Sequence, residues 1–354
     1  MRDINSFWNS QPVDVGESNT GIINKPKNIS KIPIELPEGY RWVDMKNPDI
    51  ITKFLRLHYY KNRGDWYLKY SNESISKIFN SPAFNKSYSI GLVKGNVLYG
   101  YIYGHKHKIH CSGVNDTILS VNFLCLIKQA RNKKFAPKLI EELTRRAYLN
   151  GIYKTIFLRD ANTGFRFTEA QYYHLTLNDE KFIIHDIYIP KREKITFKKR
   201  SSIKVSEFTN EDFLKMHAVY QKNFFKFDLY DNISFDEFKY MMTPLNNCNY
   251  TVFDPNTGHF ASFYTIDNYN FTTNVSIKKA YLYYWVGDSD IIRDTIAYAK
   301  ELGFDMFDVL KIGENESYVI DKFNFTVGSG TLYYHLFNWK QNIKGSCKVN
   351  FLLF

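Results

Sequence analysis

A short polar stretch of the chain carries four cations, Lys128, Arg131, Lys133 and Lys134. Before it, residues 118–127 form a nearly continuous apolar run, which is typical of a strand buried on both faces. After it, residues 136–150 repeat apolar side chains at helical spacing, and Gly151 is expected to end that helix in a left-handed cap. A strand, a basic loop and a helix N-terminus can hold phosphate, because unpaired N–H groups and the helix dipole point the same way. A solvated surface turn has the same pattern, so both interpretations stay open.

A second copy of this order lies in the C-terminal half. Residues 278–286 predict a strand, residues 288–302 a helix and residues 304–310 a returning strand. The loop before the second helix carries Asp288 and Asp290 where the first loop carries cations. Two carboxylates repel a pyrophosphate. We therefore expect the N-terminal copy alone to hold a nucleotide cofactor and the C-terminal copy to serve the acceptor.

The composition predicts two domains and an anionic partner. The 354 residues exceed one ordinary core, and 44% hydrophobic residues are ample for burial. The net charge of +11 favours a polyanion, either nucleic acid or a cofactor such as CoA. The cations are dispersed without a nucleic-acid-binding spacing, and the basic stretch 198–204 lies between folded segments. We expect no nucleic-acid partner.

The cysteines and the apolar runs indicate the compartment. The four cysteines are widely scattered along the chain, at Cys111, Cys125, Cys248 and Cys347. This pattern indicates reduced thiols of a cytoplasmic protein. The N-terminus has no signal-peptide core, and no run approaches the length of a membrane span. We expect a cytoplasmic monomer without stable membrane insertion.

The segment HKHKIHC at 105–111 raises the question of a metal site. Three histidines and one cysteine can ligate zinc, but their spacing matches no established zinc pattern. A strand end with alternating side chains also explains the segment, and we expect no metal.

The stretch from Val121 to Phe157, VNFLCLIKQARNKKFAPKLIEELTRRAYLNGIYKTIF, closely resembles the hallmark segment of the N-myristoyltransferase family. Further segments follow that family in order: FWNSQPV, LPEGYRW, DPNTGHFASFYT, GFDMFDVL, LYYHLFNWK and the final KVNFLLF. The resemblance covers essentially the full chain. These enzymes transfer a myristoyl group from CoA to an N-terminal glycine, so the resemblance implies myristoyl-CoA as the donor and peptides or nascent proteins with an N-terminal glycine as acceptors.

The resemblance also implies a fold. It is an α/β fold with a mixed sheet, in which two tandem GNAT-like acyltransferase domains are related by pseudo-twofold symmetry. We place an acyl-CoA-binding domain at 1–185 and a domain for the peptide acceptor and the C-terminal carboxylate at 186–354. Apolar periodicity adds a helix at 47–60, and residues 87–93 and 97–104 predict a hairpin.

The family's cofactor contacts transfer to two segments of this chain. An N-terminal arm covers the acyl-CoA, and a buried strand with its following loop holds the thioester and the pyrophosphate. The corresponding residues are Asn5, Ser6, Phe7, Trp8, Val121, Asn122, Phe123, Leu124, Gln129, Ala130, Arg131, Asn132, Lys133, Lys134, Phe135 and Ala136. Asn5 and Ser6 depart from the family pattern, and Phe7 with Trp8 also fits an aromatic staple that closes a core.

The resemblance assigns the chemistry largely to the main chain. The N–H groups of Phe123 and Leu124 form the oxyanion hole, and Asn122 places the amine. The base is the C-terminal carboxylate, which here belongs to Phe354. The apolar tail NFLLF would carry this group inside, although the same tail also fits a last core strand with its carboxylate at the surface. A break in strand pairing at Phe123 would release the two donors.

The acceptor side shows departures from the family. Its predicted contacts are Tyr59, Tyr60, Leu158, His174, Tyr240, Ser262, Tyr264, Ser329 and Gly330. Leu158 replaces a threonine that holds the glycine amine, and Ser329 replaces an acid. The loop that is acidic in the family carries Lys61 and Arg63 here, so a lysine-rich acceptor should be disfavoured. Gly328 and Gly330 are expected to form a turn.

Three functions are compatible with the sequence. The first is N-myristoylation of glycine with an altered peptide preference. The second is acyl transfer to another amine, such as a lysine or a small amine. The third is an idle acyl-CoA-binding module with the same fold.

Overall fold

The structure is a computed structural model that describes residues 7–8, 10–13, 20–59, 65–160, 165–189, 195–315 and 317–353. The chain forms two compact units. The first takes Met1–Tyr60, Ala83–Glu169 and Leu332–Lys344, and the second takes Lys61–Pro82, Ala170–Thr331 and Gly345–Phe354. Each unit therefore combines segments that lie far apart in the sequence.

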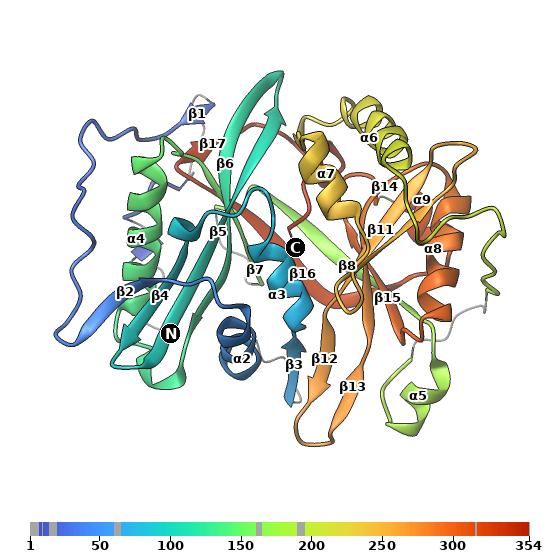
Figure 1. Cartoon of the computed structure of the whole chain (residues 1–354), viewed down its shortest axis with the longest axis horizontal. Coiled ribbons are helices and arrows are strands. Elements are labelled where there is room, and N and C mark those ends of the chain that lie inside the picture. The colour runs from blue at the N-terminus through green and yellow to red at the C-terminus, as the bar shows by residue number, and fades with distance from the viewer. Residues whose placement is uncertain are drawn as a thin grey trace. The chain divides into compact units, whose positions relative to one another are not determined.

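A mixed sheet forms the centre of the first unit. Its strands, in spatial order, are β2 (Tyr40–Asp44), β4 (Ser89–Lys94), β5 (Val97–Cys111), β6 (Val114–Leu126), β7 (Thr155–Arg159) and the last part of β16 (Thr326–Phe337). Strands β6 and β7 pair in parallel, whereas their neighbours pair antiparallel. Figure 1 shows β5 and β6 as one long hairpin. The short strands β1 (Gly21–Ile22) and β17 (Trp339–Lys340) pair with each other.

Helices of the first unit cover this sheet. They are α2 (Pro48–His58), η2 (Lys86–Tyr88), η3 (Lys128–Ala130) and α4 (Phe135–Leu149). Helix α4 packs on β4, β5 and β6, and its stripe of Leu139, Leu143 and Ala147 is buried as predicted. Gly151 follows with φ +73, which confirms the left-handed end. Helix α2 and the hairpin of β4 and β5 confirm the predictions at 47–60 and 87–104.

A mixed sheet also forms the centre of the second unit. Its strands, in spatial order, are β10 (Asn249–Phe253), β11 (Phe260–Thr265), β14 (Lys279–Val286), β15 (Met306–Lys311), β8 (Thr168–Thr176) and the first part of β16. Strands β14 and β15 pair in parallel. Smaller pairings join β3 (Trp66–Lys69), β12 (Asp267–Asn270) and β13 (Val275–Ile277), and β9 (Leu229–Asp231) with β18 (Val349–Asn350).

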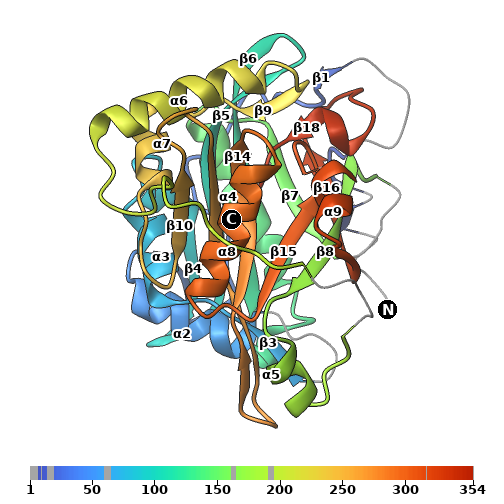
Figure 2. The same ribbon diagram turned by 90° about the vertical axis from the view of Figure 1, so that its right-hand side faces the viewer.

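The helices of the second unit are α3 (Asn72–Phe79), α5 (Asp179–Ile184), α6 (Asn210–Phe224), α7 (Phe235–Met242), α8 (Ser289–Glu301), α9 (Ser317–Lys322) and η4 (Ser346–Lys348). Figure 2 shows α8 in front of β14 and β15. Its buried Ile291, Ile292 and Ile296 belong to the apolar core of this unit. Burial of such side chains drives the packing of the helix.

The predicted repeat is present in both units. In the first unit α4 connects β6 to β7, and in the second α8 connects β14 to β15, each time between parallel strands. Two parallel neighbouring strands need a crossover connection, which the helix supplies in each unit. The prediction of an α/β fold with a mixed sheet and two copies of one motif is confirmed.

The basic stretch 198–204 is paired with carboxylates of its own unit. Arg200 Nε lies 2.7 Å from Asp294 Oδ2, and Arg200 Nη1 lies 3.2 Å from Asp254 Oδ2. Lys204 Nζ lies 2.5 Å from Asp212 Oδ2. These contacts neutralise much of the stretch and attach it to the fold.

Across the described ranges, no helix combines the length and the apolar character that a membrane crossing needs. The four cysteines are present as free thiols, and Cys347 is the exposed member of the set.

Candidate active site

A β-bulge interrupts the hairpin of β5 and β6 where the resemblance places the oxyanion hole. The register shifts between Tyr101 and Tyr103, so that Phe123 and Leu124 together face one residue of β5. Phe123 adopts φ +58, a left-handed conformation that is costly for a large side chain. A bulge directs main-chain groups away from the regular ladder, so these two residues are suited to address a ligand through their N–H groups.

Two tyrosines hold the ring of Phe123. Tyr59 lies edge-on to it with ring centroids 5.8 Å apart, and Tyr103 stacks on it at 6.3 Å. Burial raises the pKa of Tyr59 to about 12, and a main-chain hydrogen bond with Phe123 opposes the rise. The Tyr59 hydroxyl therefore stays protonated at neutral pH beside the main chain of the bulge.

Strands β6 and β7 part just before the bulge. Their parallel ladder ends at the pair Val121 and Phe157, although β6 continues to Leu126 and β7 to Arg159. On its other side, β7 stays paired with β16 as far as its last residue, Arg159. The end of the ladder leaves a place where an extended ligand can insert its own amides between two strands.

The loop after β6 has the features of a phosphate site. Its residues Asn132 and Lys134 adopt φ +63 and +59, and Lys134 precedes α4 without a side-chain cap. The first turn of α4 contains no acid. Arg131 fixes the loop, because its Nη2 donates to the carbonyl oxygen of His58 at 3.0 Å and its Nε to that of Leu126 at 3.3 Å. Uncapped N–H groups and exposed cations at one helix end favour an anion.

The corresponding helix of the second unit is closed to anions. Asp288 caps α8, with its Oδ1 accepting from the N–H groups of Asp290 at 2.9 Å and Ile291 at 3.4 Å. A carboxylate thus occupies the donors that a phosphate would need. The contrast agrees with the expectation that the N-terminal copy holds the nucleotide.

An aromatic group forms around Trp8 in the first unit. Trp8 stacks on Phe157 at 5.1 Å, and Phe7 and Phe165 lie beside it at 5.1 and 5.8 Å. On its other side, Phe157 stacks at 5.1 Å on His335, which is fully buried. These contacts attach the described part of the N-terminal arm to β7 and β16, next to the end of the β6–β7 ladder.

His335 makes the stability of this group depend on pH. Burial lowers its pKa from 6.5 to about 4. Above pH 6.5 the imidazole is neutral in both the folded and the unfolded chain. As the pH falls towards 4, the unfolded chain binds the proton more readily than the folded chain, so the folded state loses stability. We expect the free energy of unfolding to fall by about 3 kcal/mol between pH 6.5 and pH 4. Urea unfolding of the wild type and of His335→Asn between pH 6.5 and pH 4 tests this prediction. The difference in free energy of unfolding between the two proteins should shrink as the pH falls.

The predicted acceptor residue His174 contacts a buried ion pair. His174 Nδ1 lies 2.7 Å from Asp308 Oδ1, and Lys279 Nζ lies 2.5 Å from Asp308 Oδ2. Burial alone would raise the pKa of Asp308, but Lys279 and His174 hold it below its usual range. The carboxylate fixes the orientation of the His174 ring. The sequence signal that we missed was an acid inside the apolar strand β15.

Gly328 approaches His174 closely. It lies within strand β16, as Gly330 does, so the predicted turn is wrong: both glycines belong to an extended strand. A Cβ at Gly328 would lie 2.2 Å from His174 Nε2. Glycine is required here for close packing and not for a turn.

We expect Gly328→Ala to destabilise the protein by about 1–3 kcal/mol, because the added methyl group forces His174 away from Asp308. Thermal unfolding measures the effect. Gly330→Ala is the matched control, since its Cβ would lie 3.2 Å from Tyr172 Cδ2. Equal melting temperatures of the two variants would contradict the requirement.

The other predicted acceptor residues of the second unit have internal partners. Tyr264 stacks on Tyr281 at 5.2 Å, and Tyr240 donates its hydroxyl to the carbonyl oxygen of Lys77 at 2.8 Å. Ser262 is buried and donates to the carbonyl oxygen of Tyr284 at 3.0 Å. Ser329 lies in β16 next to Gly330, whose carbonyl oxygen accepts from Gln171 Nε2 at 2.7 Å.

Some predicted site residues lie outside the part of the chain that the structure describes: Asn5, Ser6, Tyr60 and Phe354, with the loop residues Lys61 and Arg63.

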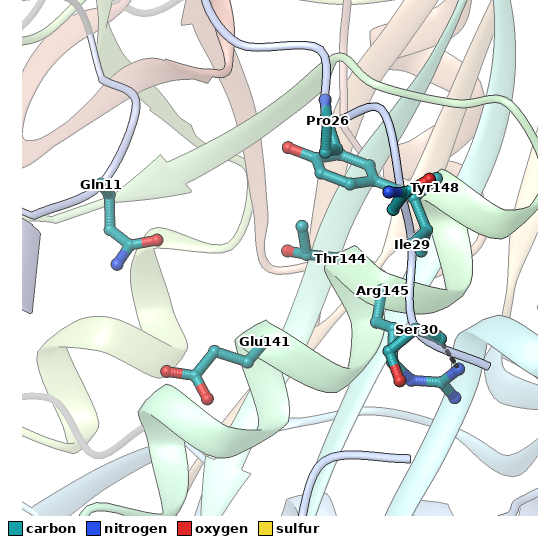
Figure 3. A pocket seen from close by; sticks show the side chains of 9 residues that line it. Gln11, Pro26, Ile29, Ser30, Glu141, Thr144, Arg145 and Tyr148 are labelled. Atoms are coloured by element: carbon teal, nitrogen blue, oxygen red, sulfur yellow. Dashed lines mark hydrogen bonds between the residues drawn. The ribbon is translucent and has the colours of Figure 1, made fainter. Parts of the chain in front are cut away.

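A hollow of about 280 Å³ lies between α4 and the N-terminal segment that includes residues 26–30. Figure 3 shows Glu141, Thr144 and Tyr148 of α4 on its wall, together with Pro26 and Ile29 of the segment before β2. None of its lining residues belongs to the predicted site.

The histidines of 105–111 make contacts within the hairpin. His105 Nδ1 lies 2.8 Å from the hydroxyl of Tyr103, and His107 Nε2 lies 2.9 Å from that of Ser120. Lys106 and Lys108 are exposed on the opposite face of β5, as strand alternation predicts. In the described ranges, no three His, Cys, Asp or Glu side chains gather as a metal site.

Known structures share this fold. A crystal structure of Saccharomyces cerevisiae N-myristoyltransferase with bound myristoyl-CoA superposes with a TM-score of 0.87 over 100% of both chains, at 22% sequence identity. A second structure of that yeast enzyme has a TM-score of 0.88 and covers 99% of this chain and 94% of the other.

Family models identify the family directly. The N-terminal domain of myristoyl-CoA:protein N-myristoyltransferase matches residues 21–168, and its C-terminal domain matches residues 177–351. The chain therefore belongs to the N-myristoyltransferase family of acyltransferases.

Curated relatives include glycylpeptide N-tetradecanoyltransferase 2 of Danio rerio, 27% identical over 94% of this chain and 74% of the relative. Glycylpeptide N-tetradecanoyltransferase of Emericella nidulans is 26% identical over 94% and 78%, and enzyme 1 of Arabidopsis thaliana is 27% identical over 94% and 85%.

Proposed function

We propose that this protein transfers the myristoyl group of myristoyl-CoA to the N-terminal glycine of proteins. The observation that carries the proposal is the combination, in the first unit, of the bulge at Phe123 with the uncapped basic start of α4. The bulge is suited to bind an oxyanion, and the basic start of α4 is suited to bind a pyrophosphate. Family membership supplies the donor and acceptor classes, and we further propose a cytoplasmic monomer.

The donor lies along the end of the β6–β7 ladder in this proposal. Residues 129–136 bind the pyrophosphate, and Val121 to Leu124 contact the pantetheine arm and the thioester. The N–H groups of Phe123 and Leu124 hydrogen-bond the thioester oxygen as it gains charge during attack. The main-chain hydrogen bond between Phe123 and the Tyr59 hydroxyl supports this role, because a ligand oxygen can take the place of that hydroxyl.

The acceptor amine must lose a proton before it attacks. Asn122 orients the amine, and the carboxylate of Phe354 takes the proton. An α-amino group and an α-carboxyl group differ by about four pKa units in water, which opposes the transfer by about 5–6 kcal/mol. Burial raises the carboxylate pKa and lowers the amine pKa, so a dry site narrows the gap. The buried side chains of Phe351 and Leu352 in the second unit support an inward course of the tail.

We propose an altered peptide preference. The cations of 61–63 repel basic acceptors, and Leu158 cannot hydrogen-bond an amine as a threonine does.

Labelled myristoyl-CoA and a panel of glycine-initiated peptides with basic, neutral and acidic continuations test the function. We expect transfer to glycine peptides, with the basic ones poorest. Transfer to lysine side chains or small amines alone would favour the second candidate, and binding of acyl-CoA without release of CoA would favour an idle module.

A further inference from the structure

Arg159 is a half-buried cation at the end of β7, and one of its hydrogen-bond donors is buried and unused. It ends an otherwise apolar strand, TIFLR, and pairs in the ladder with Tyr333 of β16. Its Nη1 is buried and makes no hydrogen bond to any described residue. A buried donor without an acceptor is costly, and more so on a charged group. Such a group calls for a ligand that supplies the acceptor.

The surroundings of Arg159 provide an apolar platform and one exposed carboxylate nearby, that of Asp160. The guanidinium carbon lies 5.9 Å from the centre of the Trp8 ring, which itself stacks on Phe157. Burial lowers the pKa of Arg159, and the charge of the neighbouring Asp160 opposes this shift. Asp160 is exposed, and no ion pair joins it to Arg159 among the described residues. His335, also near Arg159, stays neutral because its pKa is about 4.

The position of Arg159 links it to the reacting end of the site. Its strand has left the β6–β7 ladder two residues earlier, at Phe157. On the parallel strand β6, Phe123 of the bulge lies two residues beyond the same last pair of the ladder, Val121 and Phe157. The end of β7 and the bulge therefore face the same region of the first unit. In the proposed function, the phosphates of the donor bind the cations of the loop that follows β6, so Arg159 stays available for another anion.

We propose that Arg159 binds a carboxylate of the acceptor peptide, so that acceptors with Asp or Glu close to the N-terminal glycine are preferred. This inference rests on the proposed function, because it places the acceptor beside the bulge. A guanidinium matches a carboxylate with two parallel hydrogen bonds, and the Trp8 face keeps the pair in a partly dry setting where it is strong. The preference also agrees with the basic loop at 61–63, which repels cationic acceptors.

Pairs of glycine-initiated peptides test the proposal. The two peptides of a pair differ only in carrying Asp or Asn at one position, and each position after the glycine is tested in turn. Their binding is measured by calorimetry on the protein saturated with a non-hydrolysable thioether analogue of myristoyl-CoA. We expect the best-placed Asp peptide to bind about 10- to 100-fold more tightly than its Asn partner. Arg159→Met should bind the Asp and the Asn peptide equally well, while its affinity for the myristoyl-CoA analogue stays unchanged. Arg159→Glu should reverse the preference towards a Lys peptide.

Arg166→Met is the matched control. Arg166 also lies over an aromatic ring, with its guanidinium carbon 5.9 Å from the centre of Tyr333, but it pairs with Glu169 at 3.3 Å. This variant should keep the full Asp-to-Asn ratio. An equal ratio in the wild type and in Arg159→Met at every position overturns the proposal. Because binding is measured without turnover, the result is independent of whether glycine is acylated, which a separate transfer assay decides.

Discussion

Removal of Phe354 is expected to lower the rate of acyl transfer by about 10²- to 10⁴-fold, the usual contribution of a general base. The shortened chain ends one residue earlier, so its carboxylate no longer occupies the position of the proposed base. Binding of myristoyl-CoA should be unchanged, because the donor contacts assigned to Val121 to Leu124 and to the loop before α4 belong to the first unit. Titration with myristoyl-CoA and single-turnover release of CoA measure the two quantities separately.

Two variants serve as controls for this prediction. Phe354→Ala keeps a carboxylate at the same main-chain position, so it should retain most of the turnover and lose only side-chain packing. Extension of the chain by several polar residues moves the carboxylate away and should reproduce the loss. Full activity of the shortened and the extended chains would remove the proposed base.

Deletion of Leu124 is expected to lower turnover by about 10²- to 10³-fold, the cost of losing an oxyanion donor. The bulge places Phe123 and Leu124 opposite one residue of β5, so the deletion restores a regular ladder and consumes the N–H groups in strand pairing. Leu124 is 37% exposed, which limits the loss of packing. Rates with saturating myristoyl-CoA and peptide measure the effect.

The control for the bulge is Leu124→Ala, which keeps the main-chain N–H. It should retain the rate within a few fold, while the deletion loses it. If both variants lose the rate equally, the side chain and not the main-chain donor is responsible. Circular dichroism and thermal unfolding check that the deletion variant keeps its fold.

The local parts of the architecture were predictable because they depend on neighbours in the sequence. The apolar run before the basic loop is strand β6, the apolar stripe after it is α4, and Gly151 ends the helix with a positive φ. The same periodicity indicated α8 and its strands. Patterns of this kind act within one or two turns, so sequence order alone reveals them.

The contacts that assemble the site could not be predicted in this way. His174, Lys279 and Asp308 meet through three different strands, and the clash that makes Gly328 necessary involves a residue more than a hundred positions away. Arg159 could be recognised as unusual only once its donor was seen buried against Trp8. Such groups depend on tertiary packing, and their sequence signal is limited to a charged residue in an apolar strand.

The position of the acyl group on the product decides whether the protein is a glycine N-myristoyltransferase. The protein is incubated with myristoyl-CoA and a peptide that carries an N-terminal glycine and one internal lysine, and the product is fragmented in a mass spectrometer. We expect one myristoyl group on the glycine α-amine and none on the lysine. A product acylated only on the lysine, or an unmodified peptide despite bound myristoyl-CoA, would contradict this expectation.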